Sequence, residues 1–324
     1  MTDTTERESN NGASKTRKVL IVICLTLITL SSAYLFGSYS YPRNIFPIDL
    51  IRTLKNKSNI SAELGNGQYD EFGRLVAING KKEVACPAQR SDTGVLLARG
   101  QSNSANHADK KITTQYPNQV FNYYDGKCYV AASPLLGATG EEGEFITLLA
   151  DKLIENGAYK AIVIISSGIS GTPIARWQAD GDLNQMLLDT LAPIKKYKVT
   201  DVVWHQGESD FSNSTSTKVY EKSFLSLKDS LRTGGIKAPF FIAVASKCGN
   251  NPLWKASNPT AIGQKNLEDK NQIFLAVNTD ELLESNDRRS DFCHFSETGQ
   301  LKTATAYADK IKKISSRKLT QQPF

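Results

Sequence analysis

Short apolar runs alternate with longer segments of helical periodicity along most of the chain after residue 92. Apolar runs of strand length predict five buried β-strands, at 94–98, 160–166, 201–204, 239–244 and 272–277. Apolar residues at helical spacing predict helices at 144–156, 183–197, 218–232, 260–269 and 296–313. Because parallel strands that alternate with helices are covered on both faces, we expect an α/β fold: a doubly wound, flavodoxin-like sandwich with a five-stranded parallel sheet.

The N-terminal part has a different pattern. Residues 1–18 are polar and rich in Thr, Ser, Asn and Glu, which predicts a disordered tail. Residues 19–36 are apolar and uncharged, about the minimum length for a transmembrane helix. A cleaved signal peptide is the alternative, with a loose small-residue site at 31–33. The long polar tail favours an uncleaved membrane anchor.

The remaining boundaries follow from where the strand–helix alternation begins and ends. Residues 37–92 are read as a linker region, with a short helix over 45–57 and a short strand over 74–78, and no chemistry is apparent in it. Residues 93–315 form the predicted catalytic domain, in which 119–133 has an irregular or extended pattern. Residues 316–324 are a C-terminal tail.

Composition and charge exclude some classes of function. The chain has 324 residues and a net charge of +6, and its basic residues form no stripe interleaved with aromatic residues, which argues against nucleic-acid binding. The oligomeric state stays open.

The cysteines bear on compartment. Of the five cysteines, Cys24 lies in the apolar N-terminal run, and four lie in the globular part. In an exported domain these four permit two disulfides, and four buried thiols are the alternative. No C-x-x-C pair is present, which argues against a zinc site. Since Lys and Arg flank residues 19–36 on both sides, it is the cysteines and the short tail that lead us to expect a catalytic domain outside the cytoplasm, periplasmic or extracellular, or secreted if the segment is cleaved.

Polar motifs follow the ends of the predicted strands. The sequence Gly-Gln-Ser-Asn-Ser at 100–104 follows the first strand, and 166–171 and 205–210 follow the second and third. Asp-Phe-Cys-His at 291–294 comes after the fifth. Because the carboxyl ends of parallel strands meet at one edge of a sheet, where such folds bind ligands, we expect these motifs to form one site.

The residue types at this edge match a serine esterase. Ser102 needs a base, and His294, three residues after Asp291, is one of only three histidines in the chain. The backbone N–H groups of Ser102 and Gly171 and the side-chain amide of Gln206 are candidate oxyanion donors. Alternative roles are a helix cap for Ser102 and a structural hydrogen-bonding role for Gln206.

Further residues are candidates for substrate binding or support. Gln101 and Asn103 flank the serine, and His107 lies close behind it. Glu208 reads as a network residue that fixes loops. Arg176 has the chemistry to meet an acidic sugar, and an ordinary ion pair is the favoured alternative.

The ordered blocks carry a family resemblance. Gly-Gln-Ser-Asn at 100–103, a Gly-rich turn ending in Ala-Arg-Trp at 175–177, Trp-His-Gln-Gly-Glu at 204–208 and Asp-Phe-Cys-His at 291–294 together resemble the SGNH hydrolases, within them the sialate O-acetylesterase and carbohydrate esterase family 6 branch. The resemblance covers roughly residues 93–315. It implies Ser102 as nucleophile, Asp291 and His294 as the other triad members, Gly171 and Gln206 in the oxyanion hole, and no metal or organic cofactor.

The expected function is therefore removal of O-acetyl groups from a carbohydrate, such as sialic acid, a polysaccharide or another glycan, by a serine esterase. The alternatives are a carbohydrate O-acetyltransferase that uses the same triad and a non-catalytic glycan-binding envelope protein. The expected partners are an acetylated carbohydrate and, through the N-terminal helix, a membrane. We also expect a disulfide between Cys248 and Cys293, since Cys248 lies just after the fourth strand.

Overall fold

The computed structural model describes residues 21, 25–36, 67–191 and 197–320 and divides into two compact units, 1–64 and 65–324. In the first unit, residues 21 and 25–36 are helical. The predicted tail over 1–18 and the predicted helix over 45–57 lie outside the described residues. So does the whole first part of the linker region, 37–66.

The predicted transmembrane helix over 19–36 is not supported. Within the described part of the chain, no helix has both the length and the apolar character needed to cross a membrane. Residues 19, 20 and 22–24 of the predicted segment lie outside the described residues.

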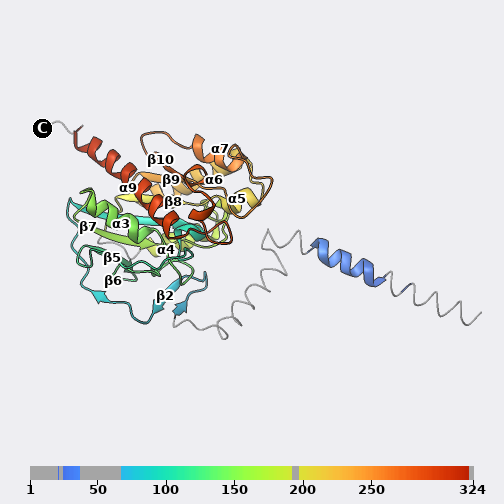
Figure 1. Cartoon of the computed structure of the whole chain (residues 1–324), viewed down its shortest axis with the longest axis horizontal. Helices are drawn as coiled ribbons and strands as arrows, with labels where there is room; N and C mark the ends of the chain where they lie inside the picture. The colour runs from blue at the N-terminus through green and yellow to red at the C-terminus, as the bar shows by residue number, and fades with distance from the viewer. Residues whose placement is uncertain (1–20, 22–24, 37–66, 192–196, 321–324) are drawn as a thin grey trace, which may run out of the picture. The chain divides into compact units, whose positions relative to one another are not determined.

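The second unit is built on a mixed sheet of eight strands in the order β10-β9-β8-β4-β7-β5-β6-β3 (Figure 1). All neighbours from β10 to β5 are parallel, whereas β6 and β3 are antiparallel to theirs. The strands are β3 (Glu83–Val84), β4 (Thr93–Gly100), β5 (Val120–Tyr124), β6 (Lys127–Val130), β7 (Ala161–Ser166), β8 (Asp201–His205), β9 (Phe240–Val244) and β10 (Ile273–Asn278). A separate antiparallel pair consists of β1 (Gly67–Tyr69) and β2 (Leu75–Ile78).

The prediction of a five-stranded, wholly parallel sheet is therefore wrong. The segment 119–133, read as irregular or extended, forms the hairpin β5–β6. Its two turn residues, Asp125 and Gly126, both have positive φ, 45° and 80°, as a tight hairpin turn requires. β5 joins the parallel part beside β7, and β3 adds a short outer strand next to β6. A disulfide between Cys86 and Cys128 ties this outer edge to the segment that follows β3.

Helices cover both faces of the sheet. Apolar residues of α3 (Ile146–Glu155) and α9 (Glu297–Thr320) share one core with Leu96 and Ala98 of β4. Those of α4 (Asp182–Leu191) and α6 (Thr217–Thr233) share the other core with Val95 and Leu97. Successive side chains of β4 thus point to opposite faces, and all eight of its residues are buried. The remaining helices are α5 (Glu208–Ser212), α7 (Pro259–Asn266), α8 (Thr279–Leu282) and three 3₁₀ turns at Ser102–Ser104, Ile174–Arg176 and Ser285–Asp287.

Local sequence sets where the helices begin. The Ser216 side chain accepts a hydrogen bond from the Val219 N–H at the start of α6, and the Asn258 side chain accepts one from the Ala261 N–H at the start of α7. Such caps satisfy backbone donors that have no partner inside the helix. At the start of α9, the hydroxyl of Ser296 accepts a hydrogen bond from the Gly299 N–H.

The Cys86–Cys128 disulfide closes a loop of 42 residues, so removing it should destabilise the protein through the unfolded state. We expect the variant Cys86→Ala to lose about 2–4 kcal/mol of unfolding free energy in urea denaturation. Because the bond needs both sulfur atoms, the double variant with Cys128→Ala should lose little more than the single variant. Additive losses, or a Cys86→Ala variant as stable as the parent, would contradict the cross-link.

Candidate active site

The turn after β4 places Ser102 at the carboxyl edge of the sheet. Gly100 has a φ of +130°, and a Cβ atom there would lie 1.9 Å from the His205 carbonyl oxygen, so the position requires glycine. The Gln101 N–H donates to that same carbonyl at 3.1 Å, and the Ser104 N–H and hydroxyl both bind the Gln101 carbonyl at 2.9 Å. Ser102 is therefore held on a tight turn at the end of a central strand.

Asn103 joins this turn to the loop that carries His294. Its Nδ2 donates to the Cys293 carbonyl at 3.2 Å, and its Oδ1 accepts from the Phe295 N–H at 3.2 Å. The same Nδ2 donates to Oε1 of Glu208 at 2.8 Å. Since the two backbone bonds are to the residues on either side of His294, they fix that residue beside the Ser102 turn.

Asp291 and His294 form a hydrogen-bonded pair. Nδ1 of His294 lies 2.7 Å from Oδ2 of Asp291, while Oδ1 accepts from the backbone N–H groups of Cys293 and His294 at 2.9 and 3.0 Å. Burial acts to raise the pKa of Asp291, but these hydrogen bonds outweigh it and hold that pKa below its ordinary value. With Nδ1 engaged, Nε2 is the ring nitrogen left to accept a proton. Within the described chain, no hydrogen bond joins His294 to the Ser102 hydroxyl.

The ring of His107 supports His294 on another side. The two ring centroids are 5.8 Å apart at an interplanar angle of 26°. Nε2 of His107 lies 3.2 Å from the Thr139 hydroxyl, which also accepts the Ser170 N–H at 2.9 Å. Burial, with the charges of His294 and Arg289, lowers the pKa of His107 to about 4, so this ring is neutral near pH 7.

The loop after β7 supplies a free backbone donor. The Ile169 N–H donates to the Gly100 carbonyl at 2.9 Å, and the Gly168 carbonyl accepts from the Thr139 N–H at 3.0 Å. Gly171 follows at φ +68° and is exposed. Among the described residues, no protein acceptor binds the N–H of Gly171 or that of Ser102. Both are thus available to a ligand oxygen.

Gln206 is engaged inside the protein. It is fully buried, and its Nε2 donates to the Thr172 carbonyl at 3.1 Å, to Oε1 of Gln101 at 3.3 Å and to a carboxylate oxygen of Asp210. Its Oε1 accepts from the Tyr220 hydroxyl at 3.1 Å. An amide nitrogen has two hydrogens, so this one has none left for an oxyanion. The contacts favour the alternative role, in which Gln206 and Gln101 hold the loops together.

Glu208 and Arg176 have supporting contacts. Glu208 is buried, and among the described residues its Oε2 has no hydrogen-bond partner, while burial raises its pKa to about 7. Arg176 binds Asp182 through Nε at 3.1 Å and through Nη2, which is the ordinary ion pair considered above. Neither residue contacts Ser102 or His294 directly.

A disulfide holds the second half of the site. Cys248, after β9, is bonded to Cys293, the residue before His294. The Gly249 N–H also donates to the Phe292 carbonyl at 3.1 Å. This is the pair expected from the sequence, and it ties the His294 loop to the end of a parallel strand.

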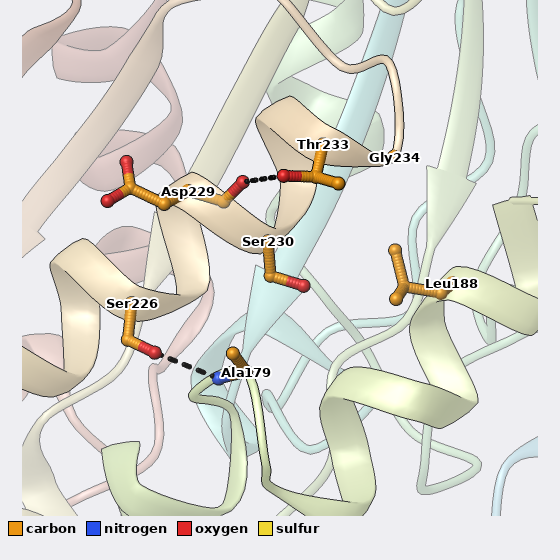
Figure 2. Close-up of a pocket in the computed structure, with 7 residues that line it drawn as sticks. All are labelled: Ala179, Leu188, Ser226, Asp229, Ser230, Thr233 and Gly234. Atoms are coloured by element: carbon orange, nitrogen blue, oxygen red, sulfur yellow. Dashed lines mark hydrogen bonds between the residues drawn. The ribbon is translucent and has the colours of Figure 1, made fainter.

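One hollow of the described surface has none of these residues in its lining. Figure 2 shows it between α4 and α6, lined by Ala179, Leu188, Ser226, Asp229, Ser230, Thr233 and Gly234. The Ser226 hydroxyl there accepts the Ala179 N–H at 3.1 Å, and no histidine lines the hollow. In the part of the chain that the structure describes, no group of three His, Cys, Asp or Glu side chains is placed to hold a metal ion.

Comparison with known proteins supports an esterase fold. The family model for "Carbohydrate esterase, sialic acid-specific acetylesterase" matches residues 92–313. A protein from Arabidopsis thaliana superposes with a TM-score of 0.53 at 15% identity, over 68% of this chain and 98% of its own. A carbohydrate acetylesterase from Xanthomonas citri gives 0.46 at 18% identity, over 69% and 56%, and NanS gives 0.47 at 14% identity, over 74% and 100%. No curated protein matches the chain.

The raised pKa of Glu208 makes stability depend on pH. Its ordinary value is 4.5 and its folded value is about 7, so the folded state holds the proton more tightly and stability falls as pH rises between these values. Glu208→Gln removes this charge but keeps an oxygen for Asn103. We expect the variant to gain roughly 2 kcal/mol in unfolding free energy relative to the parent between pH 5 and pH 8.

His107 and His205 also have lowered pKa values, but they contribute equally to the stability of the parent and of the variant. Their contributions therefore cancel when the two unfolding free energies are subtracted. The matched control is Glu155→Gln, at an exposed glutamate that pairs with Lys152 on α3, and it should change stability by less than about 0.5 kcal/mol at either pH. A Glu208→Gln difference that stays constant from pH 5 to pH 8 would show that Glu208 is ionised throughout.

Proposed function

Since the chain belongs to the family of carbohydrate esterases described as sialic acid-specific acetylesterase and is thus a carboxylic ester hydrolase, we propose that it removes O-acetyl groups from a glycan through an acyl-enzyme on Ser102. The observation that carries this proposal is the pair of hydrogen bonds between the Asn103 side chain and the backbone of Cys293 and Phe295. It holds the Asp291–His294 pair beside the Ser102 turn, at the edge where the free N–H groups of Ser102 and Gly171 also lie.

In the proposed reaction, His294 acts as the general base. Asp291 accepts a hydrogen bond from Nδ1–H and orients the ring, so Nε2 takes the proton of the Ser102 hydroxyl as the oxygen attacks the acetyl carbonyl. The backbone N–H groups of Ser102 and Gly171 donate to the developing oxyanion, and donors of this kind contribute about 3 kcal/mol each. His294 then protonates the departing sugar oxygen, which leaves Ser102 acetylated.

The second half of the reaction reverses the first with water. His294 removes a proton from a water molecule that attacks the acetyl-serine carbonyl, the C–O bond to Ser102 breaks, and the serine oxygen regains a proton. Acetate and the free sugar hydroxyl are the products. The lowered pKa of His107, about 4, keeps its ring neutral near pH 7, so it supports His294 without competing for the proton of Ser102.

We further propose that the catalytic domain acts outside the cytoplasm. Two disulfides support this location, because such bonds persist in oxidising compartments. One of them adjoins His294, so a reducing environment would loosen the loop that carries the base.

The proposed roles predict a sharp loss of activity. We expect Ser102→Ala and His294→Ala each to lower kcat for p-nitrophenyl acetate by at least about 10⁴-fold, because the two residues act as a unit. The thermal unfolding of both variants should stay unchanged. Asp291→Asn should cost roughly 10³–10⁴-fold, since an amide in place of the carboxylate no longer favours the tautomer with the proton on Nδ1 and does not stabilise the imidazolium.

Ser226→Ala is the matched serine control, because this residue lines the hollow between α4 and α6 (Figure 2), and it should keep full activity. Acetate release by the Ser102→Ala variant at a tenth or more of the parental rate would sink the assignment of the nucleophile.

A further inference from the structure

A second cavity, of about 250 Å³, opens at the same edge of the sheet as Ser102. It is lined by Tyr124 and Ser166, the last residues of β5 and β7, by residues before β2, and by α4. We call it the Arg74 cleft. Its volume is just below the range of about 300–1,000 Å³ typical of ligand pockets, so it suits one small unit.

Backbone hydrogen bonds link the wall of the Arg74 cleft to a segment that supports the candidate active site. Arg74 pairs with Thr139 in an antiparallel β-bridge, and the next residue, Leu75, bonds to the Ala138 carbonyl at 2.9 Å. Thr139 is the residue whose hydroxyl binds both His107 and the Ser170 N–H. A molecule in the cleft therefore lies next to the segment that positions the loop of Gly171.

The wall of the cleft is preorganised. Arg74 has a side chain only 12% exposed, and its Nε binds Asp70 and its Nη1 the Thr190 hydroxyl, both at 2.6 Å. Its guanidinium lies 5.8 Å from the centre of the Phe72 ring. Because these contacts fix the guanidinium before any ligand arrives, little conformational entropy is lost on binding.

One buried polar group in the cleft lacks a partner. Ser166 is 2% exposed, and among the described residues its hydroxyl makes no hydrogen bond. A buried hydroxyl without a partner is costly. The partly buried rings of Phe72 and Tyr124 add apolar faces, so the lining combines ring surface with hydrogen-bonding groups, as a sugar requires.

The charge of the cleft selects among sugars. Three carboxylates, those of Glu71, Asp125 and Asp189, line it together with the single guanidinium of Arg74, which is already paired with Asp70. An anionic sugar would meet an excess of negative charge, whereas a neutral or amine-bearing sugar would not.

We propose that the Arg74 cleft binds a neutral or amine-bearing sugar unit next to the acetylated one and selects against substrates with a sialic or uronic acid at that position. This inference rests on the proposed esterase function. Part of the lining, residues 71–74, precedes residue 92, where the family match begins.

The test compares kcat/KM for O-acetylated cellotriose, which is neutral, for O-acetylated trigalacturonic acid, which is anionic, and for p-nitrophenyl acetate. We expect the parent to favour the neutral trisaccharide by about tenfold or more. Tyr124→Ala should raise KM for it about tenfold with little change in kcat, because only binding contacts are removed. A purely structural role of Tyr124 would instead lower kcat for all three substrates.

Charge reversal gives the matched pair of variants. Asp189→Lys on α4 should raise the anionic-to-neutral ratio of kcat/KM about fivefold or more. Asp229→Lys on α6, at an exposed aspartate in the hollow of Figure 2, should leave that ratio unchanged.

The possible failures are distinguishable. If Ser102-dependent hydrolysis is absent for all three substrates, the esterase function itself fails. If p-nitrophenyl acetate is hydrolysed but neither trisaccharide is, or if both are used equally and Asp189→Lys shifts the ratio no more than Asp229→Lys, the cleft proposal is overturned.

Discussion

Three segments that are far apart in the sequence meet at the carboxamide of Asn103. It donates to Glu208 after β8 and to the Cys293 carbonyl, and it accepts from the Phe295 N–H. Asn103 is fully buried, so each of these hydrogen bonds is made away from water, and losing a partner would leave a buried polar group unsatisfied. The position of His294 relative to Ser102 therefore depends on this side chain more than on the exposed pair that His294 makes with Asp291.

The residues around the Asn103 hydrogen bonds lower the stability of the folded protein, because several are polar groups buried without a partner. Glu208, His205 and Arg288 are all buried behind Asn103, and each carries a polar atom without a hydrogen-bond partner among the described residues. Such groups are expensive to bury. The Cys248–Cys293 disulfide offsets part of this cost by limiting the freedom of the loop in the unfolded chain. The disulfide thus helps to keep the site rigid next to buried polar groups that lack hydrogen-bond partners.

Strand ends and motif order could be predicted from the sequence, since they depend on local pattern. The predicted runs appear as β4, β7, β8, β9 and β10, and their ends bring the motifs of Ser102 and His294 to one edge. The hairpin β5–β6 was missed although Asp125-Gly126 is a strong turn signal, because the flanking residues were read as irregular. The engagement of Gln206 and the stacking of His107 were beyond reach, because both depend on tertiary contacts that no local pattern records.

The missed elements also form part of the Arg74 cleft. The hairpin β5–β6 extends the sheet beyond β7, and the end of β5 supplies Tyr124 to the Arg74 cleft. Residues 70–75, which read as linker, pack against the segment at 137–139 that also fixes the loop of Gly171. The chemistry at Ser102 depends on the central parallel strands, whereas the charges of the cleft come from residues before β2, from the β5–β6 turn and from α4.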